Sequence, residues 1–177
     1  SMKTRVLSLL LVGTVAGISL APRAALALGP SPDGVWQIVP KAQLDARGAV
    51  GAAPWIQPSA FTPALLEGSQ LAALLASAPH ERTTAVKDGV TILLPTPGGS
   101  YERFVIVESR MMESGLSDWL VQQGHPMKTY LGQSLDTPGA IVYLDFGGPG
   151  GFHAQVLGIG TRWMIDPYWK GDTVAYA

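Results

Sequence analysis

A helical pattern of apolar residues occupies one stretch near the middle of the chain. Within "TPALLEGSQLAALLASAP", apolar side chains recur at the i, i+3, i+4, i+7 spacing of one helix face: Leu71, Leu74, Leu75 and Ala78. Ser69 can cap the start of this helix, and Pro79 ends it. Thr62, which precedes Pro63, can cap an earlier turn. We therefore predict an amphipathic helix whose apolar face packs into the core.

After residue 89 the pattern changes to runs of β-branched and aromatic residues, which are typical of strands. "VTILLP" (90–95) and "YERFVIVES" (101–109) flank the loop "TPGGS" and predict a hairpin. Three further strand-like runs follow at 140–146, 152–159 and 162–168. "GIGT" joins the last two runs closely enough for a tight turn.

A second short helix completes the predicted fold. "SGLSDWLVQQGHP" can be capped by Ser114 or Ser117 and ends at Gly124, and its apolar face holds Leu116, Trp119 and Leu120. The elements together predict an α+β domain with a mainly antiparallel sheet of about five to seven strands and two short helices packed on it.

The glycine cluster in "DFGGPGGFHAQV" could cradle a phosphate or form the tip of a hairpin. A phosphate-binding loop needs a strand before it and a helix after it, and the P-loop pattern also needs a lysine. Here the following residues Phe152, Ala154 and Val156 alternate with polar ones, as in a strand. We therefore predict that residues 147–151 are a structural hairpin tip.

The first 27 residues have the layout of a secretory signal peptide. A basic start leads into an apolar run at 6–21, and the small-x-small sequence at 25–27 suits cleavage. The run is short for a membrane span, which needs about 20 residues. We therefore expect a secreted or periplasmic protein with no membrane association after the signal is removed. Ser1, which precedes Met2, is interpreted as a remnant of expression.

The remaining chain divides into a lead-in and a domain. Residues 28–60 are rich in Gly, Pro and Ala, so we expect a loosely ordered lead-in or a first edge, with "VWQIVP" as a short strand. Residues 61–177 are predicted to form one domain. The chain carries 12 Lys and Arg against 13 Asp and Glu, and three of the cations lie in the signal. The mature chain therefore has a net charge of −4, which does not favour binding to nucleic acid.

Few residues suggest chemistry of their own. The chain has no cysteine, which excludes disulfides, thiolate zinc ligands and a cysteine nucleophile. Its histidines, His80, His125 and His153, are far apart, and the "HE" at 80–81 lacks the second histidine of H-E-x-x-H because Thr84 stands there. We expect His153 to be a packed or hydrogen-bonded strand residue. Spacing does not exclude a Ser/His/Asp triad, but there is no G-x-S-x-G, so we assign no catalytic, cofactor-binding or metal-binding residue.

The C-terminal "TRWMIDPYWKGDTVAYA" is rich in aromatic residues, which are common both in cores and in interfaces. We expect Trp163 to be a core residue. Tyr168, Trp169 and Tyr176 are candidates for a partner-binding surface, with burial in the core as the alternative. The sequence leaves this choice open.

Several short motifs, taken in order, resemble a known family. "LAALLASAPHE", "SYERFVIVESRMMESGLSDWL", "HPMKTYLGQSLDTPGA" and "GFHAQVLGIGTRWMIDPYW" are similar to the N-terminal propeptide region of bacterial secreted reprolysin-like zinc metallopeptidases. The likeness covers about residues 65–170, although the "GGPGG" tip is longer and richer in glycine than in that family. The positions that carry it, called the motif residues below, are Ala78, Pro79, Glu81, Glu102, Arg103, Phe104, Val107, Glu108, Ser109, Met112, Pro126, Met127, Lys128, Thr129, Tyr130, Gly132, Asp136, Pro138, Gly151, Phe152, His153, Ala154, Ile165, Asp166, Pro167 and Tyr168.

The resemblance implies a non-catalytic pro-region that assists folding of a zinc metallopeptidase catalytic domain and keeps it latent, in cis or in trans. Without cysteine, a carboxylate or occlusion by the backbone would have to silence the zinc. The zinc motif H-E-x-x-H-x-x-G-x-x-H does not occur in these 177 residues. A stand-alone secreted binding module, such as a peptidase inhibitor or a surface adhesin, is the alternative. A small secreted hydrolase would need a pocket with converging polar groups, of which the sequence gives no sign.

Overall fold

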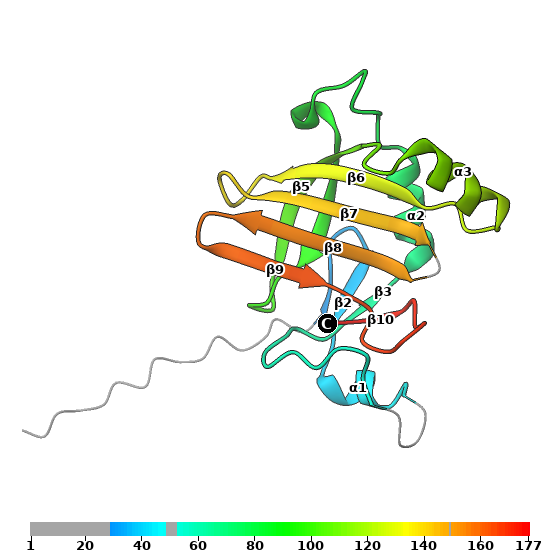
Figure 1. The fold of residues 1–177 in the computed structure, drawn as a ribbon. Helices are drawn as coiled ribbons and strands as arrows, with labels where there is room; N and C mark the ends of the chain where they lie inside the picture. Colours follow the sequence, from blue (N-terminus) through cyan, green and yellow to red (C-terminus); the bar gives the residue numbers. More distant parts are fainter. Residues whose placement is uncertain (1–28, 49–52, 149) are drawn as a thin grey trace, which may run out of the picture.

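The computed structural model describes residues 29–48, 53–148 and 150–177, so the predicted signal peptide lies outside the described residues. The main feature is a six-stranded antiparallel sheet in which spatial order equals chain order (Figure 1). Its strands are β4 (Val90–Pro95), β5 (Tyr101–Glu108), β6 (Lys128–Ser134), β7 (Ile141–Gly148), β8 (Gly151–Gly158) and β9 (Thr161–Ile165). The predicted α+β class with a mainly antiparallel sheet is confirmed, and the predicted hairpin of 90–95 with 101–109 is β4–β5.

A second antiparallel sheet joins the two ends of the described chain. Its order is β1 (Gly29–Pro30), β2 (Trp36–Ile38), β3 (Ala64–Leu66) and β10 (Ala175–Tyr176). The strands have two or three residues each, so their few ladder hydrogen bonds depend on packing by the side chains they carry. The turn expected after Thr62 is strand β3 instead.

For 28–60 we expected a loosely ordered lead-in or a first edge, and residues 29–48 form the edge, with β1 as the outer strand of the small sheet. The predicted strand in "VWQIVP" forms as β2, and the short helix α1 (Lys41–Asp45) follows it. The Pro- and Gly-containing turn before β2 is fixed by its polar residues, because the Trp36 N–H donates to Ser31 Oγ at 2.9 Å and the Val35 N–H donates to Asp33 Oδ1 at 3.1 Å. Trp36 and Leu44 are fully buried. Composition alone indicated turns here, and it did not show that these turns are anchored.

Helix α2 (Gly68–Ala76) lies on the same side of the large sheet as the small sheet (Figure 1). Leu71 and Leu75 are buried as predicted, with Leu74 and Ala78 packed at the edge of the core. No side chain caps this helix, because the hydroxyl of Ser69 bonds to the Glu67 carboxylate at 2.8 Å instead of to the backbone.

The core lies between α2, the small sheet and one face of the large sheet. The large sheet contributes alternate residues from all six strands: Ile92, Leu94, Phe104, Ile106, Tyr130, Val142, Leu144, Phe152, Ala154, Val156 and Ile165. On the opposite face, Val105 and Val107 are also buried, and the short 3-10 helix η1 (Val86–Asp88) packs against their strand. Strand β5 is therefore buried on both faces.

Helix α3 (Ser114–Gln122) forms where it was predicted but buries no side chain. Leu116 and Trp119, which were expected to face the core, are 47% and 53% exposed. The helix projects beyond one end of the large sheet, where no other element covers it (Figure 1). Neither Ser114 nor Ser117 caps it, because Glu113 occupies the N-cap position without a side-chain bond. In the described part of the chain, no helix has the length and apolar character needed to cross a membrane.

Candidate functional site

The aromatic residues proposed as a partner surface lie mostly in the interior. Tyr168 and Tyr176 are 3% and 0% exposed, so they do not form a contact surface in this structure. Tyr168 stacks on Phe61 with ring centroids 5.5 Å apart, and the indole N–H of half-buried Trp169 donates to the Leu44 carbonyl at 2.8 Å. The surface hypothesis is corrected for both tyrosines, because the C-terminal segment returns to close the small sheet.

Tyr176 connects the two sheets. Its ring packs edge-on against Trp36 at 5.5 Å, and its hydroxyl accepts the Phe152 N–H at 3.0 Å. Burial raises the pKa of Tyr176 to about 12. Gly151 is required beside this hydroxyl, because it has φ +90° and an added Cβ would lie 2.8 Å from the tyrosine oxygen. The glycine cluster is thus a hairpin tip between β7 and β8, as predicted.

Many of the polar motif residues contact one another. The segment after α2 lies beside the end of β5, where the Glu108 N–H donates to the Pro79 carbonyl at 2.9 Å. The Glu81 carboxylate accepts the Ser109 hydroxyl at 2.7 Å and the Arg110 N–H at 3.1 Å. The Ser109 hydrogen bond, followed by that from Arg110, lowers the pKa of Glu81. The motif residues within 78–81 and those within 107–109 therefore form one structural unit.

Two further motif pairs cross neighbouring strands. Lys128 Nζ pairs with Glu108 Oε2 at 2.7 Å, from β6 to β5. The Asp136 carboxylate accepts the Arg103 side chain at 3.0 Å from Nε and the Arg103 backbone N–H at 2.7 Å. The side-chain bond from Arg103 is the main reason that the pKa of Asp136 is lowered. These carboxylates hold the β5–β6 pair and the turn that follows it.

His153 is the centre of a small charged cluster on β7, β8 and the end of β9. Its Nδ1 lies 2.8 Å from Asp166 Oδ1, and it pairs in register with Asp145 on β7. The Asp166 hydrogen bond is the largest of several effects that raise the pKa of His153, which also include a hydrogen bond to the Gly150 backbone. Burial raises the pKa of Asp145. The prediction of a hydrogen-bonded strand histidine is confirmed, because the Nδ1 atom of His153 is held by Asp166.

The other histidines form no site with His153. His80 Nδ1 accepts the Arg82 N–H at 3.1 Å, and His125 is exposed at the end of α3. Among the residues that the structure describes, no three His, Asp or Glu side chains are grouped so as to hold a metal ion.

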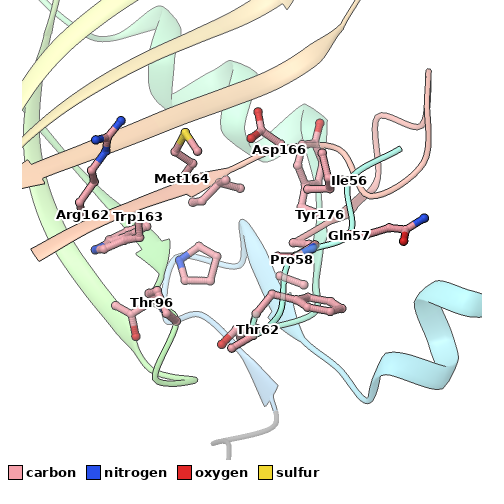
Figure 2. A pocket seen from close by; sticks show the side chains of 17 residues that line it. Ile56, Gln57, Pro58, Thr62, Thr96, Arg162, Trp163, Met164, Asp166 and Tyr176 are labelled. Atoms are coloured by element: carbon pink, nitrogen blue, oxygen red, sulfur yellow. The ribbon is translucent and has the colours of Figure 1, made fainter. Parts of the chain in front are cut away.

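A groove of about 560 Å³ lies beside strand β9 (Figure 2). One wall is the strand segment from Arg162 to Asp166, and the other is the loop from Ile56 to Thr62. Its lining is largely apolar and includes Ile56, Pro58, Phe61, Pro95, Trp163 and Ile165. Trp163 is only partly a core residue, since it packs edge-on against Phe104 at 6.2 Å and also borders this groove.

The sequence did not indicate this groove. Its two walls are about 100 positions apart in the chain, and the loop wall falls in a stretch with no periodic pattern. The one available signal was the strand-like run at 162–168, which did not show that its outer edge would be open. The groove is therefore a product of the tertiary structure.

Comparison of the chain with models of protein families, with curated proteins and with solved structures gives no match. The fold and the groove define a cysteine-free α+β domain with a six-stranded antiparallel meander and a largely apolar groove along its edge strand.

Proposed function

We propose that this domain is a non-catalytic pro-region that assists folding of a zinc metallopeptidase catalytic domain and keeps it latent. The observation that carries the proposal is the pairing of motif residues: Glu81 with Ser109, Glu108 with Lys128, Arg103 with Asp136, and His153 with Asp166. A likeness in sequence to a propeptide region does not by itself require these motif residues to be neighbours in space. Their contacts support the interpretation that they specify this fold as a unit.

The pairing also favours one form of latency. A carboxylate that silences zinc must be free to leave its own partners. The carboxylates of Glu81, Asp136 and Asp166 are instead bonded to other side chains of the domain. We therefore propose that the domain covers the zinc cleft with a surface, so that substrate is excluded sterically. Export by the signal peptide at residues 1–27 is part of the proposal and gives a secreted or periplasmic location.

A stand-alone secreted binding module is the second candidate. The groove beside β9 favours it, because an apolar concavity of this size lies within the range of about 300–1,000 Å³ that is typical of ligand sites. Both candidates are binding functions, and they differ in whether the domain also assists folding of a peptidase catalytic domain or acts as an independent binding protein.

An inhibition assay tests the first proposal. A reprolysin-like zinc metallopeptidase domain from the source organism is assayed on a quenched peptide with increasing amounts of the 177-residue protein. We expect saturable inhibition at one-to-one stoichiometry and a higher refolding yield of the peptidase when the protein is present. The variant Trp119→Ala is the control for folding. The substitution lies on exposed α3 and removes no buried contact, so this variant should fold like the unchanged protein. Full activity and unchanged refolding yield at saturating protein would overturn the pro-region proposal.

A further inference from the structure

We propose that the groove beside β9 binds an extended segment of a partner polypeptide as an additional antiparallel strand. Strand β9 is at the edge of the six-stranded sheet, with β8 on one side. Five consecutive residues, 162–166, border the groove. Side chains alternate between the two faces of a strand, so five in a row line one cavity only when the edge of the backbone faces it.

The hydrogen-bond pattern shows which backbone groups face the groove. Asp166 exchanges both backbone hydrogen bonds with Ala177, at 3.2 and 3.0 Å, and the Tyr168 N–H donates to the Ala175 carbonyl at 2.8 Å. In an antiparallel ladder, alternate residues point to the same neighbour. The N–H and C=O groups of Met164 and Arg162 therefore point away from β8 into the groove, where no described residue bonds to them.

An open strand edge of this kind is a template for another strand. The pairing of 166–168 with 175–177 lies beside the groove and sets the register in which a further strand would pair with residues 162–165. A bound segment would lie opposite Ile165, Met164, Trp163 and Arg162 in turn as it runs from its N-terminus to its C-terminus. A four-residue segment spans about 14 Å at roughly 3.4 Å per residue.

The lining specifies the chemistry of the segment. Residues that are opposite one another in an antiparallel pair share a face, so the positions opposite Ile165 and Trp163 point toward the apolar lining. The position opposite Arg162 lies on the outer face. Arg162 is exposed, and in the described part of the chain no carboxylate pairs with it. The preferred segment is therefore apolar, any residue, apolar, acidic. This proposal concerns a site and its ligand class, and it holds for either candidate function.

Peptide binding measured by NMR titration of the 177-residue protein tests the proposal. The probe is the capped peptide acetyl-Val-Thr-Val-Glu-Thr-amide. Its second and fourth residues would exchange hydrogen bonds with Met164 and Arg162, while the first and third point their backbone groups away from β9. N-methylation of the second and fourth residues should weaken binding by about tenfold or more, because each removes a hydrogen bond. N-methylation of the first and third residues is the matched control and should have little effect.

Charge reversal provides a second test that does not depend on the backbone. Arg162→Glu should weaken binding of the glutamate peptide and favour the same peptide with lysine at its fourth position, whereas Arg82→Glu at another exposed site should change neither. The proposal would be overturned by the absence of saturable shifts near β9 or by equal losses from both N-methylated peptides. Concentration-dependent dimers that the peptide does not displace would also overturn it, since the occupant would then be a second copy of this chain.

Discussion

The two sheets of this protein differ in one pairing, because only the small sheet joins strands from opposite ends of the described chain. In the large sheet every strand pairs with its neighbour in the chain, from β4 to β9. In the small sheet β3 pairs with β10, so residues near position 65 are held by residues near 175. Pairing strands that are far apart in the chain costs more chain entropy than pairing neighbouring strands. Strands of two residues form few hydrogen bonds to offset that cost. The small sheet therefore depends on its buried aromatic residues, whereas the large sheet has both long ladders between neighbouring strands and a large share of the core.

The largest expected effect is that of Trp36→Ala in β2. Trp36 is 1% exposed and packs edge-on against Phe152 and Tyr176, so its removal takes contacts from both sheets. We expect the free energy of unfolding in urea to fall by about 3–5 kcal/mol. Trp119→Ala on exposed α3 is the matched control and should change it by less than about 0.5 kcal/mol. Equal effects of the two substitutions would contradict the proposed dependence of the small sheet on its aromatic core.

A smaller loss of stability is expected from Tyr176→Phe, which keeps the ring but removes the hydroxyl. The buried Phe152 N–H then has no acceptor, which should cost about 1–3 kcal/mol in the free energy of unfolding. Hydrogen exchange of the Phe152 amide should rise with it. Tyr143→Phe, on the partly exposed face of β7, is the control and should be nearly neutral. An unchanged exchange rate at Phe152 would mean that this bond does not join the sheets.

The smallest effect concerns the charged cluster within the large sheet. Since the pKa of His153 is raised in the folded protein, the native state holds this proton more tightly than the unfolded chain does. The associated stability is fully present below about pH 6.5 and is lost as the pH rises through the folded pKa. Asp166→Asn should lower the pKa of His153, measured by NMR, and reduce stability at pH 6 by less than about 1 kcal/mol. A His153 pKa that is unaffected by Asp166→Asn would exclude this pair as the cause.

The same division separates the elements that local sequence patterns predict from those that they do not. The period-two runs at 90–95 and 101–109 and the glycine-rich turn at 147–151 are local patterns, and each lies where it was predicted. The helix at residues 68–76 was likewise visible from the spacing of its leucines. The N-terminal stretch looked irregular because its Pro and Gly residues specify turns, while the contacts that order it come from far away. Trp169, for example, holds the Leu44 carbonyl from 125 positions along the chain.

The sequence by itself determined the class of the fold, most of the strands of the large sheet and the lack of cysteine chemistry, because these depend on local periodicity and on composition. Only the tertiary structure decided that Tyr168 and Tyr176 are interior, that α3 is exposed and that the edge of β9 borders an open groove. Whether a residue is buried depends on what lies across from it. In this protein the facing residues often belong to the opposite end of the chain, where no local pattern can specify them.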